Sequence, residues 1–438
     1  MFLPLPFLAR MEQLLEGEFP AFAAGYASPP YSGLRVNPLK VSPKKFLEFS
    51  PFHLQSLPWT DEGFLVDREN TFPGKHPYHA AGLYYLQEPS AMAVVEALAP
   101  QPNERILDLA AAPGGKTTHL AARMHNTGLL IANEIHPRRV WDLAENLERW
   151  GATNAVITNE SPENLAEHLG PIFDRVLVDA PCSGEGLFRK TPLAATEWSE
   201  ALVQSCSIRQ SAILDQAAKM VRPGGYLVYS TCTFAPQENE LVIARLVDQA
   251  KKQGKIRFEV VSLAHIPGLD SAHPEWISPF LENIDIHLDL AARIWPHRNP
   301  GEGHFIALLH RTDTGSPVSI QRQSKKTDLH HDRLKQAMRY YRDFCQETFQ
   351  SEPFQGLLEV AGSYLYKPPI PITMLHGLKV IHPGFWLGTF KKDRFEPSQA
   401  LAMALRVEQV QRTLPLDPED PFCSAYLRGE TLHGALVK

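Results

Sequence analysis

Short apolar runs alternate with longer amphipathic segments through the middle of the chain. The runs lie at 105–109, 129–133, 155–158, 176–178 and 226–229. Between them, apolar residues recur at helical spacing over 116–124, 139–150 and 203–221. Parallel strands need crossover helices, so this alternation predicts an α/β fold with a doubly wound parallel sheet. Two later runs, near 258–261 and 305–309, are expected to form a final hairpin at the sheet edge.

The pattern changes towards both ends of the chain. Before residue 78, a helical pattern precedes an extended segment and the basic residues Lys40, Lys44 and Lys45, which predicts a small N-terminal domain. After residue 311, a stretch rich in Ser, Thr and Lys predicts a linker. The expected division is therefore an N-terminal domain (1–77), a central domain (78–311), a linker (312–328) and a C-terminal region (329–438).

Composition narrows the class of protein. A chain of 438 residues exceeds one typical core, and its 44% hydrophobic and 21% charged residues are typical of a soluble folded protein. No stretch approaches the roughly 20 apolar residues of a membrane span. The apolar segment 1–10 is broken by prolines and lacks a basic region, so we interpret it as part of the fold and not as a signal peptide.

Cysteine, histidine and charge counts exclude several kinds of site. Five cysteines without a Cys-x-x-Cys motif argue against a disulfide framework or a zinc site, and the 18 histidines show no metal-ligand spacing. No metal is therefore expected, and free thiols fit a cytoplasmic location. The formal net charge of −6 means that any RNA contact must use local basic patches. The sequence is silent on the oligomeric state.

The first candidate site runs from Leu107 to Thr117, where a buried strand passes through alanines and glycines into a helix. Small residues let a ligand approach the backbone, and a helix N-terminus offers free N–H groups. A phosphate-binding P-loop is one interpretation, but Ala110 stands where such a loop needs its first glycine. The other interpretation is a loop that binds S-adenosylmethionine. Glu134, after the second strand, favours it, because a carboxylate there can accept both hydroxyls of a ribose.

Polar and reactive side chains follow the remaining strands of the predicted sheet. The third strand is followed by Asn159, Glu160 and Ser161, the fourth by Asp179 and Cys182, and the fifth by Cys232. Because the carboxyl ends of parallel strands meet at one edge of a sheet, we expect these side chains to converge on one crevice.

Two thiols in one crevice predict a covalent reaction with a pyrimidine ring. Carbon 5 of cytosine does not take a methyl group directly from a sulfonium, but a thiolate added to carbon 6 makes carbon 5 nucleophilic. An acid such as Asp179 can favour that addition by a proton or a hydrogen bond at ring N3. A second thiol can then assist loss of the carbon 5 proton and release of the first thiol. We interpret Cys206, Cys345 and Cys423 as small buried hydrophobes.

Together these motifs make the chain resemble the bacterial RNA (cytosine-5)-methyltransferases of the RsmF type, within the Nop2/Sun family. The core residues that carry the resemblance are 107–117, 133–134, 179–186, 230–233 and 236–240. Residues 34–38, 85–90 and 394–398 extend it to nearly the whole chain.

The resemblance implies a Rossmann-like class I methyltransferase core that uses S-adenosyl-L-methionine to make 5-methylcytosine in structured RNA, with 16S rRNA or the small ribosomal subunit as the expected partner. It implies that Cys232 is the nucleophile, that Cys182 assists release of the methylated base, and that Asp179 contacts the cytosine or the cofactor. It also implies an RNA-binding or substrate role for 1–77 and a C-terminal PUA-like RNA-binding domain that includes the basic segment 391–394.

The resemblance also implies the residues that surround the cofactor. Around its methionine end these are Ala110, Ala111, Ala112, Pro113, Gly114, Gly115 and Lys116, with Glu134 on its ribose. Many relatives carry an aspartate near the position of Ser161 to meet the adenine. Here that contact stays open between Asn159, Glu160 and Ser161.

Other functions stay open on the residues alone. An amino-group methyltransferase would need an Asn/Asp-Pro-Pro-aromatic motif where 179–182 reads Asp-Ala-Pro-Cys. A P-loop ATPase would need the missing glycine at Ala110. A non-catalytic RNA-binding or ribosome-assembly factor would keep the fold, although the presence of both cysteines argues against it. Transfer RNA is an alternative substrate, and the sequence does not identify the modified cytosine.

Overall fold

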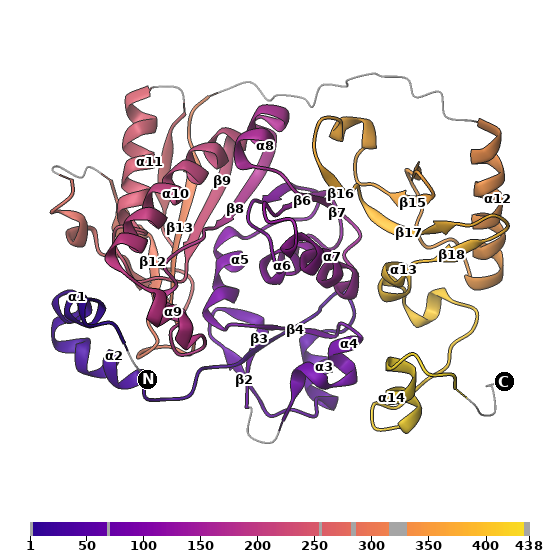
Figure 1. Cartoon of the computed structure of the whole chain (residues 1–438), viewed down its shortest axis with the longest axis horizontal. Coiled ribbons are helices and arrows are strands. Elements are labelled where there is room, and N and C mark those ends of the chain that lie inside the picture. Colours follow the sequence, from indigo (N-terminus) through magenta and orange to yellow (C-terminus); the bar gives the residue numbers. More distant parts are fainter. Residues whose placement is uncertain (1–2, 68–70, 254–255, 282–285, 315–330, 433–438) are drawn as a thin grey trace.

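The computed structural model describes residues 3–67, 71–253, 256–281, 286–314 and 331–432, and a large mixed sheet lies at its centre (Figure 1). In spatial order the strands are β11 (Asp270–Ser271), β12 (Ala292–Ile294), β13 (His304–Arg311), β9 (Val221–Thr231), β8 (Phe173–Asp179), β5 (Arg105–Asp108), β6 (Leu129–Asn133), β7 (Ala155–Thr158) and β16 (Val380–His382). Strands β9, β8, β5, β6 and β7 are parallel, as the alternating pattern predicted.

Helices cover both faces of this sheet because its strands present apolar side chains on both faces. Ile106 packs into one core and its neighbour Leu107 into the other, and Leu130 and Ile131 divide in the same way. One core receives α5 (Ala93–Leu98), α6 (Gly115–Arg123) and α7 (Arg139–Trp150). The other receives α8 (Pro162–Leu169), α10 (Glu200–Met220) and α11 (Glu240–Gln253).

The two late apolar runs pair antiparallel, but they form neither a hairpin nor a simple edge, because β11 and β12 lie between them in the chain. Strand β10 (Phe258–Val261) pairs antiparallel with the second half of β13, as predicted. Strand β13 also pairs antiparallel with β9 from Phe305 to His310, and β12 occupies the first half of its other side. Strand β13 is therefore interior to the sheet, which explains why nearly all of its residues are buried.

The N-terminal part consists of two units. Helices α1 (Leu5–Leu15) and α2 (Phe19–Gly25) pack on Phe188 and Trp198, beside α9 (Pro192–Glu197) (Figure 1). A separate sheet has the order β2 (Leu54–Leu57), β3 (Thr60–Val66), β1 (Gly33–Val36) and β4 (Tyr84–Gln87), with α3 (Pro43–Phe49) and α4 (Pro77–Ala80). Since β4 pairs with β1, this sheet extends past the boundary that we expected at residue 77.

The C-terminal region contributes its own sheet and one strand of the central sheet. Its elements are α12 (His331–Thr348), β14 (Glu359–Ala361), β15 (Tyr364–Lys367), β17 (Phe385–Phe390), β18 (Phe395–Pro397), α13 (Gln399–Ala404) and α14 (Pro421–Leu427). Strand β16 leaves this group and pairs antiparallel with β7. The linker expected at 312–328 lies, apart from its first three residues, outside the described residues.

Two of the three cations in the basic segment 391–394 form ion pairs with nearby carboxylates. Lys391 lies 3.5 Å from Glu396, and Arg394 forms ion pairs with Glu396 and Asp393. Among the described residues, no helix is long and apolar enough to cross a membrane.

Candidate active site

The predicted crevice lies at the carboxyl ends of β5, β8 and β9. The chain passes from β5 through β6 to β7 on one side and then returns to β8 on the other side of β5. Ligands of doubly wound sheets bind where the strand order reverses in this way. A cavity of about 300 Å³ lies there, lined by Tyr85, Leu86, Gln87, Glu88, Ala91, Ala110, Ala111, Ala112, Pro113, Gly115, Lys116, Asp179, Leu187, Cys232 and His304.

Most of the site residues predicted from the sequence meet at this cavity. Its wall contains Ala110 to Pro113, Gly115, Lys116, Asp179 and Cys232. Cys182, Gly114, Glu134 and Ser161 are not among the lining residues. Gly114 caps α6 with a φ of 111°, a conformation that side chains rarely adopt.

The two cysteines are adjacent because the strands that carry them are adjacent. Asp179 at the end of β8 pairs in register with Ser230 of β9, so the residues that follow both strands emerge side by side. The Sγ atoms of Cys182 and Cys232 are 3.3 Å apart. The hydrogen bond with Cys232 and burial raise the pKa of the Cys182 thiol well above its ordinary value. Cys182 therefore remains protonated at neutral pH, and its thiol lies next to the sulfur of Cys232.

A partly buried ion pair lines the cavity. Lys116 Nζ lies 2.6 Å from Asp179 Oδ2, and the Ser230 hydroxyl donates to Asp179 Oδ1 at 2.8 Å. Burial opposes the charge of Asp179, but the attraction of Lys116 outweighs it and lowers the pKa of this carboxyl. Burial likewise opposes the charge of Lys116, and Asp179 more than compensates, so its pKa is raised. Both groups are thus charged at neutral pH.

Hydrogen bonds to three backbone carbonyl groups hold the small-residue loop (residues 110–116) in place. Arg139 donates to the Ala112 carbonyl at 2.6 Å, Asn146 to the Pro113 carbonyl at 2.8 Å, and Arg35 to the Gly115 carbonyl at 2.8 Å. These three carbonyls therefore have partners, and the loop itself contributes mainly methyl groups, a proline and a glycine to the cavity wall. A Cβ at Gly115 would lie 3.3 Å from the Tyr85 ring. A loop with this shape fits a flat or slender ligand such as a nucleoside sulfonium.

Glu134 occupies the strand end at which we expected it. It follows β6, is 3% exposed, and its Oε1 accepts from the His136 N–H at 2.8 Å. Arg139 lies 3.6 Å from the other carboxylate oxygen. The carboxylate is thus fixed close to the loop at 110–116, which Arg139 also contacts.

A segment from the C-terminal region, which no local pattern linked to this site, lies at the end of β7. Ser161 caps α8 by accepting from the Asn164 N–H, and Asn159 donates to the Glu134 carbonyl at 2.7 Å. Lys379, directly before β16, donates from Nζ to Asn159 Oδ1 at 2.6 Å and from its backbone N–H to Glu160. The C-terminal region therefore reaches the place expected for the adenine contact.

Two buried glutamates that had no role assigned from the sequence organise the loop after β8. Glu238 accepts from the Ser183 N–H at 2.9 Å and from Gln210 at 2.8 Å, and burial raises its pKa to about 7. Glu185 accepts from Arg10 of α1 at 2.6 Å and from the Trp198 indole at 2.9 Å. Both glutamates belong to segments that carry the family resemblance, 179–186 and 236–240. Only their burial and hydrogen bonds reveal that they hold the loop that contains Cys182.

Asp108, beneath the cofactor loop, is expected to make stability depend on pH. Burial raises its pKa to about 7, and one carboxylate oxygen accepts from the Thr117 hydroxyl at 2.7 Å. The folded protein binds this proton more tightly than the unfolded chain, so the associated stability is complete at low pH and is lost as pH rises through 7. From pH 6 to 8, the free energy of unfolding should fall by about 1 kcal/mol through this group. Urea unfolding at both pH values should show a smaller fall for Asp108→Asn, and an unchanged fall would contradict this origin.

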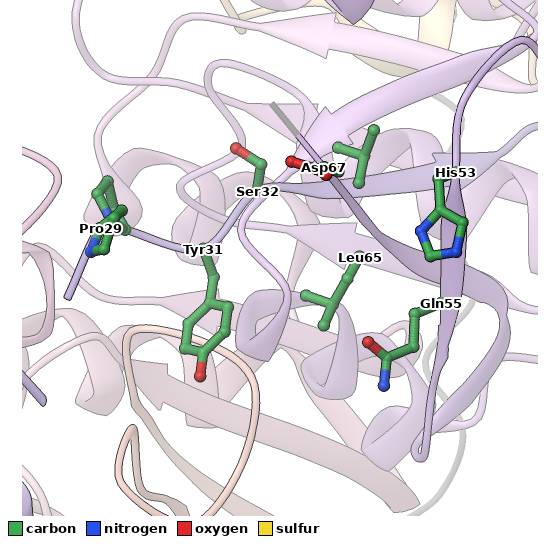
Figure 2. A pocket seen from close by; sticks show the side chains of 9 residues that line it. Pro29, Tyr31, Ser32, His53, Gln55, Leu65 and Asp67 are labelled. Carbon is green, nitrogen blue, oxygen red and sulfur yellow. The ribbon is translucent and has the colours of Figure 1, made fainter. Parts of the chain in front are cut away.

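A second cavity, of about 540 Å³, lies on the N-terminal sheet (Figure 2). Four residues stand around it: Tyr31 from the segment before β1, His53 directly before β2, Gln55 of β2 and Leu65 of β3. The Tyr31 N–H donates to Glu302 at 2.8 Å. This cavity contains none of the site residues that the sequence predicted.

Three family models match the chain in sequence order. They are the N-terminal domain of 16S rRNA methyltransferase RsmF (residues 3–89), 16S rRNA methyltransferase RsmB/F (95–310) and the first C-terminal domain of RsmF rRNA methyltransferase (343–405). The first model ends at residue 89, in agreement with the inclusion of β4 in the N-terminal sheet.

Named relatives agree with the models. Ribosomal RNA small subunit methyltransferase F of Enterobacter sp. strain 638 is 38% identical over 328 residues, and that of Erwinia tasmaniensis is 41% identical over 328 residues. Each alignment covers 73% of this chain and 65% of the relative, so the chain spans about two thirds of their length.

Solved structures share the fold. A methyltransferase homolog from Pyrococcus horikoshii is 32% identical with a TM-score of 0.60, and the match covers 69% of this chain and 94% of that one. NSun6 from Pyrococcus horikoshii is 22% identical with a TM-score of 0.59, covering 71% and 99% of the two chains. The central domain therefore has the Rossmann-like class I methyltransferase fold that we predicted.

Proposed function

The chain belongs to the RsmF-type family of ribosomal RNA methyltransferases, and from this premise we propose that it forms 5-methylcytosine in small-subunit (16S) ribosomal RNA. The observation that carries the proposal is the pair of thiols, 3.3 Å apart, beside the cavity that also contains the Lys116–Asp179 ion pair. Methylation of a heteroatom needs no such pair, whereas methylation of a pyrimidine carbon needs a nucleophile and a means to release it.

The cofactor of this family is S-adenosyl-L-methionine, which supplies an electrophilic methyl group when bound. The residues that would hold it are the small-residue loop 110–116 and Glu134. The loop leaves little side chain in the cavity, and the helix N-terminus at Gly115 offers N–H groups to a carboxylate. Glu134 would accept the hydroxyl groups of the ribose. These features fit a nucleoside sulfonium better than a triphosphate, since Ala110 again replaces the glycine of a P-loop.

Cys232 would begin the reaction by adding its thiolate to carbon 6 of the cytosine. The sulfur–carbon bond forms as the electrons of the carbon 5–carbon 6 double bond move into the ring, so that carbon 5 can attack the methyl group. Lys116 and Asp179, both charged and paired in the cavity wall, would orient the ring and stabilise the charge that develops on it.

Cys182 would act when the methylated base is released. Its raised pKa depends first on the hydrogen bond with Cys232, and this cause disappears once the Cys232 sulfur is bonded to carbon. Once Cys182 has released its own proton to solvent, its thiolate can accept the carbon 5 proton. The electrons of that carbon–hydrogen bond restore the double bond and expel the Cys232 thiolate.

The RNA must present an unpaired base, because a stacked cytosine cannot bring carbon 6 to Cys232. A ribosomal substrate would also place the protein in the cytoplasm. The N-terminal sheet and the C-terminal region flank the catalytic cavity and would choose the target, since the core recognises only one base.

The proposal is tested by incubating the protein and labelled S-adenosyl-L-methionine with ribosomal RNA, with purified small subunits and with transfer RNA. Bisulfite sequencing should locate one or a few 5-methylcytosines in 16S rRNA. If only transfer RNA becomes labelled, transfer RNA would take the place of ribosomal RNA as the proposed substrate. Cofactor binding without label in any RNA would reject the activity in favour of a non-catalytic assembly factor.

A further inference from the structure

His304 is a buried residue of the catalytic cavity to which neither the recognised motifs nor the proposed mechanism gives a role. It begins β13, whose next residue, Phe305, pairs with Thr231 of β9. This register places His304 beside the position of Cys232. The side chain is 5% exposed and lines the same cavity as Lys116 and Asp179.

A hydrogen-bond network fixes the tautomer of His304. The Glu88 carboxylate accepts from three backbone N–H groups, those of Ser90, Ala91 and Glu302, and from the Ser90 hydroxyl. Ser90 thus gives its single hydroxyl proton to Glu88, and its oxygen accepts from His304 Nδ1 at 3.0 Å. The proton of the neutral imidazole therefore lies on Nδ1, and Nε2 carries a lone pair.

That Nε2 atom is buried and has no hydrogen-bond partner among the residues that the structure describes. A buried acceptor without a hydrogen bond is costly, so a ligand donor is the natural partner for it. Burial lowers the pKa of His304, and the nearby Lys116 ammonium adds to this effect. A second positive charge next to Lys116 is disfavoured, and His304 is therefore better suited to accept a hydrogen bond than to hold a proton.

The position of His304 indicates which ligand supplies the donor. The cofactor loop follows β5 and Glu134 follows β6, whereas His304 lies on β13, with β9 and β8 between. The thiols follow β9 and β8. His304 thus borders the part of the cavity in which the target base must lie, on the side away from the ribose contact.

We propose that His304 Nε2 accepts a hydrogen bond from the 4-amino group of the target cytosine and so distinguishes cytosine from uracil. This inference rests on the proposed function. A cytosine in RNA carries its hydrogen-bond donors only on that amino group, and uracil presents an acceptor oxygen at the same position. Uracil would place two acceptors face to face in a dry site. Glu88 and Ser90 act as positioning residues, because they fix the tautomer of His304.

The test measures base preference without the covalent step. In a Cys232→Ala background with the cofactor product bound, RNAs that span the mapped cytosine are compared with the same RNAs carrying uridine at that position. With His304 intact, cytidine should bind about 10-fold more tightly. With His304→Phe, this preference should fall to near unity, and His304→Gln, whose amide can donate or accept, should reduce it similarly. In the otherwise unmodified enzyme, His304→Phe should lower kcat/KM about 10- to 100-fold.

The control is His310→Phe, at the other end of β13, where a phenyl ring can retain the stacking on Tyr226. It should leave the base preference unchanged. A cytidine preference that survives in His304→Phe would overturn the inference, as would a loss of cofactor affinity as large as the loss of base preference. Failure of the wild-type protein to methylate any RNA would instead reject the proposed function, so the two failures are distinguishable.

Discussion

Replacement of Cys232 by alanine is expected to lower kcat/KM for RNA methylation by more than about 1,000-fold, because it removes the thiol proposed to form the bond to carbon 6. Replacement of Cys182 by alanine is expected to produce a different defect. The first thiol can still attack, but the methylated base is released slowly, so protein and RNA should remain covalently joined. Methyl transfer from labelled cofactor and a denaturing gel measure the two effects.

The matched control for both variants is Cys206→Ala. Cys206 is a buried cysteine of α10, and burial raises the pKa of its thiol to about 11, so it should be inert. Cys206→Ala should methylate at nearly the wild-type rate and form no adduct. Methylation that survives in Cys232→Ala would remove the nucleophile assignment. An adduct that accumulates in Cys232→Ala instead of Cys182→Ala would exchange the two roles.

Breaking the ion pair between Glu240 and Arg293 is expected to lower the free energy of unfolding by about 3–5 kcal/mol. The pair is bidentate, at 2.8 and 2.6 Å, and the two side chains are 0% and 1% exposed. Trp276 and Trp295 flank the guanidinium. Glu240→Gln would leave that cation buried without its counter-charge. Urea unfolding followed by tryptophan fluorescence measures the loss directly, because both indoles lie against the pair.

Two further variants separate burial from charge pairing. Glu48→Gln breaks an exposed pair with Lys45, and it should change the free energy of unfolding by less than about 1 kcal/mol. The double variant Arg293→Met/Glu240→Leu removes both buried charges and should recover most of the stability lost in Glu240→Gln. Equal losses for Glu240→Gln and Glu48→Gln would contradict the role given to burial.

Local sequence was sufficient to predict the parallel part of the central sheet. A buried parallel strand is apolar on both faces, so the runs before Asp108, Asn133 and Thr158 were visible without any partner. The same runs located the residues that follow each strand. Because parallel strands end at a common edge, the positions of Cys182 and Cys232 in the sequence implied their convergence, and the structure places their sulfur atoms 3.3 Å apart.

Contacts between distant segments were not predictable in the same way. Strand β16 has only three residues, and its pairing with β7 is set by the fold of the C-terminal region. The contact of Lys379 with Asn159 and that of Arg10 with Glu185 join residues more than 150 positions apart, and neither has a local pattern. The sequence therefore determined the class of fold, the order of the core strands and the residues at their ends. Only the tertiary structure decided which buried side chains find a hydrogen-bond partner and which, like His304 Nε2, do not. The reason is that hydrogen-bond geometry and burial arise only when separate segments pack together.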